Sequence, residues 1–164
     1  MRNFSDNFNP RPEGGQGVFG GGLRGVELEG RPFPPEGAES CLKQISAGGA
    51  GFIRFMLPWT ALAGGEPGVY NEEYLAYLRK IFLAASAARL SVLVDSRGKA
   101  PDGIPRTPEE EDRFLDALRH AYRRLKNCRA VAGWVIPAQP GPDFARRFSE
   151  KMREVNPLLM VYAE

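Results

Sequence analysis

Residues 51–59 read GFIRFMLPW, and this stretch decides the fold class. Apolar residues occupy both of its alternating faces, which is typical of a parallel strand covered by helices. Arg54 is the one charge inside it. The Gly- and Pro-rich loop ALAGGEPG (61–68) then ends the run. The stretch therefore predicts a buried strand that a single charge interrupts.

Four more short apolar runs occur on either side of this stretch, and they alternate with segments of helical period. The runs are LRGVEL (23–28), SVLVDSRG (91–98), VAGWVIPAQP (131–140) and LLMVYAE (158–164). Helices are expected at about 35–47, from Asn71 onward, from Thr107 onward and at about 142–155. This order is typical of βα units, whose right-handed crossovers make the strands parallel. We expect an α/β fold with about five parallel strands and four helices.

Two helix starts are marked clearly. Thr107-Pro-Glu-Glu110 is an N-cap residue, a Pro at the first helical position and a Glu three residues on, which together predict a capping box. Asn71 is a good N-cap, and Glu72 and Glu73 follow in the first turn, where the helix dipole favours carboxylates.

The composition indicates an ordinary single domain. The 164 residues are 43% hydrophobic and 26% charged, with a formal net charge of +2. Basic residues are spread among acidic ones, so no nucleic-acid partner is expected. Residues 1–21 are mostly Asn, Pro and Gly with isolated Phe, which predicts a flexible N-terminal arm before a β/α domain over 22–164.

Cofactors, metals and membranes are not expected. Cys41 and Cys128 have no metal-ligand spacing and do not suggest a disulfide framework. No apolar run approaches the ~20 residues that span a bilayer, and the N-terminus lacks the apolar core of a signal peptide. We therefore expect a reduced, cytoplasmic chain.

Five ordered segments resemble the N-terminal half of a glycoside hydrolase family 5 barrel, of the cellulase and endoglycoceramidase type. They are LRGVELEG, GFIRFMLPW, PGVYNEEYLAYLRKIFLAASAARLSVLVD, VAGWVIPAQP and FSEKMREVNPLLMVYAE, and they cover about residues 22–164. RFMLPW followed by PGVYNEEYLAYL is the most specific part. A complete eight-stranded barrel takes about 250 residues. The resemblance therefore implies a partial (half) TIM-type (β/α) barrel, truncated before its later strands.

The resemblance also implies site residues. Arg54 matches the second-strand Arg that holds the catalytic carboxylates, and Trp59 matches the Trp after that strand. Arg97 stands where the family usually has a His lining the sugar site. The family's fourth strand ends in Asn-Glu-Pro, with the Glu as general acid/base, and here Ala138 and Gln139 precede the Pro.

These changes predict a catalytically inactive relative, a pseudoenzyme. Retaining glycosidases need two carboxyl groups about 5 Å apart. Gln139 cannot donate a proton and then recover it, although its amide can still hydrogen-bond a hydroxyl. The family's nucleophile comes from the seventh strand, and the chain is expected to stop after its fifth.

Other acids also lie near predicted strand ends, where barrels keep their chemistry. They are Glu27, Glu29, Asp95 and Glu164. Glu27 and Glu29 share one face of their strand, so either a structural ion pair with Arg54 or a catalytic pair is open.

Asp95 is equally placed to pair with Arg54 or with Arg97. Trp59 is a candidate sugar platform. Trp134, within a strand, and His120, on a helix, are interpreted as a core residue and a surface residue.

Three functions follow as hypotheses. The first is a silent glycosidase relative that binds a glycan or a protein partner. Its candidate substrate-binding residues are Arg54, Trp59, Asp95, Arg97, Gln139, Glu27 and Glu164. The second is a structural or interaction domain without a ligand. The third is an O-glycosyl hydrolase assembled from two chains, using Glu27, Glu29 or Glu164. An open half-barrel leaves sheet edges unpaired, so self-association or a protein partner is expected to cover them.

Overall fold

The computed structural model describes residues 24–29, 35–64, 66–96, 104–136, 142–156 and 160–163. Several predictions fall outside these residues: the arm over 1–21, Arg97, Ala138, Gln139 and Glu164. For Glu27 and Glu29 the structure describes the backbone alone.

The observed elements follow the predicted order, with one additional short helix. The strands are β1 (Arg24–Glu29), β2 (Ala50–Met56), β3 (Ser91–Asp95), β4 (Val131–Ile136) and β5 (Met160–Ala163). The helices are α1 (Pro35–Ala47), α2 (Trp59–Leu62), α3 (Glu72–Ala87), α4 (Pro108–Leu125) and α5 (Pro142–Arg153). Helix α2 is the addition, and α5 ends two residues before the predicted stop at 155.

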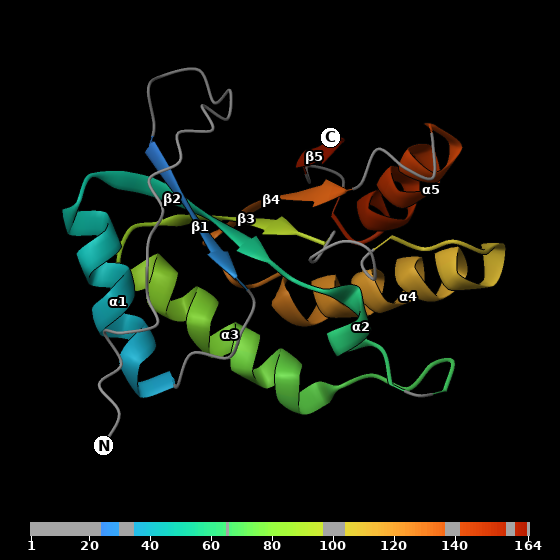
Figure 1. Ribbon diagram of the computed structural model, residues 1–164, viewed down its shortest axis with the longest axis horizontal. Helices are drawn as coiled ribbons and strands as arrows, with labels where there is room; N and C mark the ends of the chain where they lie inside the picture. Colours follow the sequence, from blue (N-terminus) through green and yellow to red (C-terminus); the bar gives the residue numbers. More distant parts are fainter. Residues whose placement is uncertain are drawn as a thin grey trace.

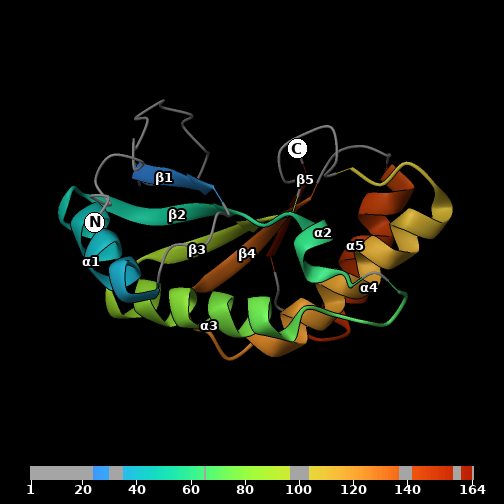
Figure 2. The same ribbon diagram turned by 60° about the horizontal axis from the view of Figure 1, so that its bottom comes forward.

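The five strands form one parallel sheet in the order β1-β2-β3-β4-β5, so each strand pairs with the next one along the chain. Figure 1 shows the strands overlapping in projection, and Figure 2 shows β1, β2, β3 and β4 following one another in this order. In Figure 2, helices α1, α3 and α4 lie along the same side of the sheet. This is the arrangement of a partial β/α barrel, and it confirms the predicted fold class.

The core lies between the sheet and these helices. Alternate strand residues face it, and they are Ile53, Phe55, Val92, Val94 and Trp134. All five are inaccessible to solvent. The ring of Phe55 meets Phe82 of α3 edge-on at a centroid distance of 5.4 Å. Burial of these apolar side chains provides the main stabilisation of the sheet against its helices.

An aromatic cluster joins α2, α4 and α5. Phe114 of α4 is fully buried, and its ring lies 5.7 Å from Trp59, 5.4 Å from Phe144 and 6.4 Å from Phe148, centroid to centroid. Because these four rings come from three helices, Phe114 fixes how α2 and α5 sit on α4.

The predicted capping box at α4 is present, with one difference. The Thr107 side chain accepts a hydrogen bond from the Glu110 backbone N–H at 3.2 Å, as expected. The Glu110 carboxylate, however, accepts from the backbone N–H of Arg106 at 2.7 Å, one residue before the cap. The cap therefore satisfies the Glu110 N–H of the first turn, and the Glu110 carboxylate ties the residue before the cap to the helix.

Thr107→Ala is expected to lower the free energy of unfolding by about 1 kcal/mol, because it removes the cap acceptor without touching the core. Urea denaturation measures this as a lower midpoint with an unchanged slope. Thr107→Ser, which keeps the hydroxyl, should retain most of the stability. Equal loss in both variants would contradict the capping role.

Candidate functional site

An ion pair between β2 and β3 dominates the carboxyl edge of the sheet. The Arg54 Nε donates to Asp95 Oδ2 at 2.7 Å, and Arg54 Nη2 lies 2.6 Å from the same oxygen. The Asp95 side chain is fully buried, whereas the Arg54 side chain is 21% exposed. A carboxylate withdrawn from water in this way depends on its guanidinium partner.

The register of the sheet explains why these two residues meet. Asp95 is the Cα partner of Met56, which lies two residues beyond Arg54 on β2. Because side chains alternate along a strand, Arg54 and Asp95 stand on the same face of the sheet. The sequence left two partners open for Asp95, and the structure pairs it with Arg54.

Backbone contacts tie the strand ends together around this pair. The Leu57 N–H donates to the Asp95 carbonyl at 2.7 Å. Ser96 donates to the Val135 carbonyl through both its backbone N–H, at 3.1 Å, and its hydroxyl, at 2.9 Å. Ser96 is fully buried, and it was not among the predicted site residues. Its position directly after a strand was the available signal.

The pair lies on the face of the sheet that points away from the helix-packed core. Leu93 and Val135 share that face, and both are buried without belonging to the core cluster. In a β/α barrel this face is the interior, and barrels place their chemistry at the carboxyl ends of the strands. The Arg54–Asp95 pair therefore occupies the position of a barrel site.

Glu27 lies next to this pair in the backbone. The register makes Glu27 the Cα partner of Arg54 on the neighbouring strand. The predicted ion pair or catalytic pair of Glu27 and Glu29 with Arg54 therefore has suitable strand placement, and its side-chain contacts stay a prediction.

Trp59 is the first residue of α2 and is only 6% exposed. Its ring packs against Phe114, and its Nε1 has no hydrogen-bond partner in the part of the chain that is described. A sugar platform needs one open ring face, and in this structure the Trp59 ring is enclosed in the core. Trp134 is fully buried and meets Tyr122 edge-on at 5.9 Å, in agreement with its predicted place in the core.

A second polar cluster lies among the helices. The His120 Nε2 is 2.6 Å from Glu72 Oε1, and the His120 ring stacks on Tyr70 at 3.9 Å with an interplanar angle of 9°. Arg124 Nη2 lies 3.0 Å from Glu72 Oε2. Hydrogen bonds from Arg124 and then His120 hold the pKa of Glu72 below its ordinary value. The sequence predicted a surface His120, but not these contacts, because 48 residues separate it from Glu72.

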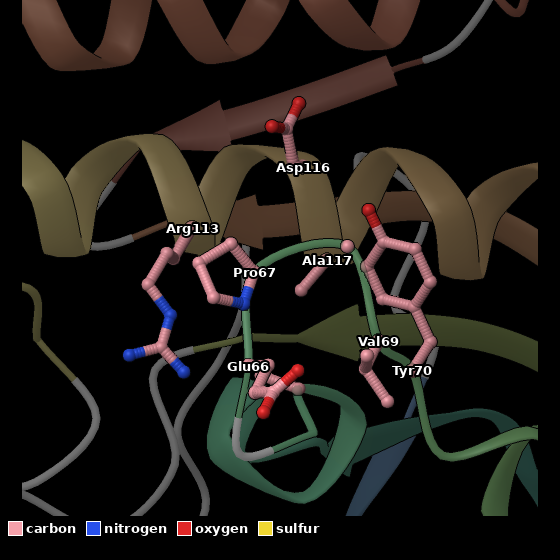
Figure 3. Close-up of a pocket in the computed structure, with 9 residues that line it drawn as sticks. Glu66, Pro67, Val69, Tyr70, Arg113, Asp116 and Ala117 are labelled. Atoms are coloured by element: carbon pink, nitrogen blue, oxygen red, sulfur yellow. The ribbon is translucent and has the colours of Figure 1, made fainter.

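A shallow hollow lies between the segment 66–70 and α4 (Figure 3). Its volume is about 40 Å³, and Glu66, Arg113, Asp116 and Tyr70 contribute polar groups to its lining. Arg113 Nη2 donates to the Gly64 carbonyl at 3.2 Å beside it. Ligand pockets usually measure about 300 Å³ or more, so this hollow suits a few waters rather than a sugar ring.

No group of three or more potential metal ligands occurs among the residues that the structure describes. Cys41 and Cys128 are free thiols. Burial raises the pKa of the Cys41 thiol and also that of the Cys128 thiol, so both side chains favour the protonated form. Within the described helices, none has the length and apolar character to cross a membrane.

Comparison with protein families finds no family model that matches the chain. Two curated proteins match parts of it. A glucosylceramidase of Rhizopus delemar is 35% identical over 72 residues, which are 44% of this chain and 10% of that protein. A glucosylceramidase of Cryptococcus neoformans is 44% identical over 52 residues, which are 32% of this chain and 7% of that protein. The matched segments thus span a tenth or less of these relatives.

Solved glycoside hydrolases share the fold. A GH5_18 protein of Streptomyces cattleya, in complex with Manb1-4GlcNAc, superposes with a TM-score of 0.67 at 16% identity over 80% of this chain and 40% of its own. An endocellulase of Pyrococcus horikoshii, in complex with cellotetraose, superposes with a TM-score of 0.65 at 19% identity. The match covers 87% of this chain and 50% of the endocellulase. An exo-beta-1,4-mannosidase of an Opitutaceae bacterium superposes with a TM-score of 0.66 at 16% identity. The match covers 82% of this chain and 30% of the mannosidase. The chain therefore has the fold of part of a glycoside hydrolase family 5-like barrel.

Proposed function

We propose that this chain is a glycoside hydrolase family 5-like protein that binds a glycan at the carboxyl edge of its sheet and does not cleave it. The observation that carries the proposal is the Arg54–Asp95 ion pair on the barrel-interior face. This pair keeps a charged side chain at the site. It also engages Asp95, whose carboxylate is the one with a described side chain at this edge.

The chemistry of the strand ends supports the lack of cleavage. Gln139 follows β4 where the family resemblance has the acid/base Glu, and an amide cannot deliver a proton to a leaving oxygen. Asp95 is a poor replacement. Its side chain is fully buried, and Arg54 contacts it through two nitrogens. A general acid has to reach the leaving oxygen and carry a proton there.

The polar groups near this edge support glycan binding. Arg54 is partly exposed and held in one orientation, and the Gln139 amide both donates and accepts hydrogen bonds. Sugar hydroxyls require both kinds of partner. Structures with this fold hold Manb1-4GlcNAc and cellotetraose, so these two oligosaccharides are the first ligands to test.

We expect saturable binding of at least one of them, with a Kd of roughly 1 mM or tighter, by calorimetric titration. Gln139→Ala should weaken this binding about fivefold, as expected for the loss of one hydrogen bond. Gln44→Ala changes the same residue type on the exposed surface of α1 and is the matched control. Equal affinity in both variants, or no saturable binding of either sugar, would contradict the proposal.

The same samples test for cleavage through the release of reducing ends. The unmodified chain should release none, and the double replacement Ala138→Asn with Gln139→Glu should not create activity. Among the side chains that the structure describes at this edge, the restored acid has no second carboxyl available for attack, because Arg54 engages Asp95. Sugar release by either protein would show that another carboxylate serves the reaction.

A further inference from the structure

The segment 66–71 connects α2 to α3 and forms a strap beside α4. An isolated antiparallel bridge joins Ala63 to Tyr70, and the Gly64 N–H donates to the Val69 carbonyl at 2.7 Å. The Asn71 N–H donates to the Leu62 carbonyl at 2.9 Å. The strap is therefore folded back on the end of α2, and Val69 at its turn is half exposed. Figure 3 shows Pro67 and Tyr70 of the strap on the side of α4.

One carboxylate joins the strap end to α4. Glu72, in the first turn of α3, contacts His120 through one oxygen and Arg124 through the other. Tyr70 of the strap stacks on the His120 ring, so the position of this ring depends on Glu72 and in turn positions the strap. We call Tyr70, Glu72, His120 and Arg124 the latch.

We propose that the latch releases the strap in acid, when Glu72 becomes protonated. A neutral carboxyl no longer attracts the Arg124 guanidinium, and its hydrogen bond to the His120 ring loses the charge that strengthens it. Protonation of Glu72 therefore weakens both of its contacts with α4.

The direction follows from the pKa of Glu72, which lies below the ordinary carboxyl value of 4.5 because Arg124 and then His120 hydrogen-bond to it. A carboxyl with a lowered pKa in the folded state stabilises that state above its unfolded value, and the contribution is lost as the pH falls through the folded value. The latch is therefore closed at neutral pH and opens below about 4.5. Glu72 is half exposed, so water screens the contact and the release is local.

The surroundings of His120 leave Glu72 as the controlling group. His120 is faced by Tyr70 from the strap, by Glu72 from α3, and on its own helix by Arg124 one turn later and Asp116 one turn earlier. Asp116 is already paired with basic side chains of α4 and α5. Since the strap follows β2 and α2, its release would alter the surface beside the carboxyl edge while the sheet stays intact.

Hydrogen exchange followed by mass spectrometry tests this in the full chain. We expect the protection of the strap amides, corrected for intrinsic exchange, to fall about tenfold between roughly pH 6 and pH 3.5, while β3 and α4 amides keep theirs. Glu72→Gln should show the loosened strap already at pH 6, with no further change in acid. Glu73→Gln, which alters the neighbouring carboxylate of the same turn, should behave like the unmodified chain.

Two results would overturn the proposal. One is strap protection in Glu72→Gln equal to that of Glu73→Gln at pH 6. The other is a simultaneous loss of protection in the strap, β3 and α4 of the unmodified chain, because that pattern is global acid unfolding rather than release of the strap.

Discussion

Asp95→Ala is expected to lower the free energy of unfolding by about 3–5 kcal/mol. The replacement removes a fully buried carboxylate and leaves the Arg54 guanidinium, held mostly inside the sheet, without the anion that it contacts at 2.6 Å. The loss is large because the cost of withdrawing Arg54 from water stays while the attraction that offset it is gone. Urea denaturation followed by far-ultraviolet circular dichroism measures it.

Two further variants separate the charge from the volume of this residue. Asp95→Asn keeps the shape and one acceptor oxygen, so it should lose less stability than Asp95→Ala. The double replacement Arg54→Met with Asp95→Leu removes both charges and should be more stable than Asp95→Ala alone, since neither ion is left buried. A double variant that is no more stable than Asp95→Ala would show that the two residues do not form an energetic unit.

Phe114→Ala should also cost about 3–5 kcal/mol, because it opens a cavity at a fully buried position. The effect extends beyond the cavity, since Phe114 contacts Trp59 of α2 and two Phe rings of α5. We therefore expect a lower urea midpoint together with a shift of the tryptophan emission towards longer wavelength, as water approaches Trp59.

Two control variants test whether the effect depends on the size of the side chain and on its buried location. Phe114→Leu fills most of the space and should cost markedly less than the alanine variant. Leu83→Ala removes a half-exposed side chain from α3 and should change the stability by about 0.5 kcal/mol or less. A Phe114→Ala protein with an unchanged midpoint would mean that the three helices are held together elsewhere.

The sheet was predictable because its signals are local. Apolar runs, helical periodicity and the Thr107 cap all act within a few residues, and they predicted the order of the strands and the bounds of α1. Helix α2 was not predicted, because its four residues, WTAL, are too few to show a helical periodicity of apolar positions. The sequence also placed the end of α5 two residues late.

The site was predictable only in part because its contacts depend on register. From the sequence, Arg54 and Arg97 were both open as partners of Asp95, and it is the pairing of Met56 with Asp95 that brings Arg54 into contact. The latch was not predicted, because its contacts also join segments that lie far apart in the sequence. Its members belong to the strap, α3 and α4, and no local pattern connects Glu72 with a histidine 48 residues later.

The buried ion pair also constrains how the sequence can change over generations. A mutation that alters Arg54 alone or Asp95 alone takes away one half of this buried ion pair and is expected to cost more stability than a change of both together. A single substitution at either position is therefore expected to lower the free energy of unfolding, whether or not a ligand is bound. A charged pair at the end of a strand can persist in this way through its contribution to folding alone.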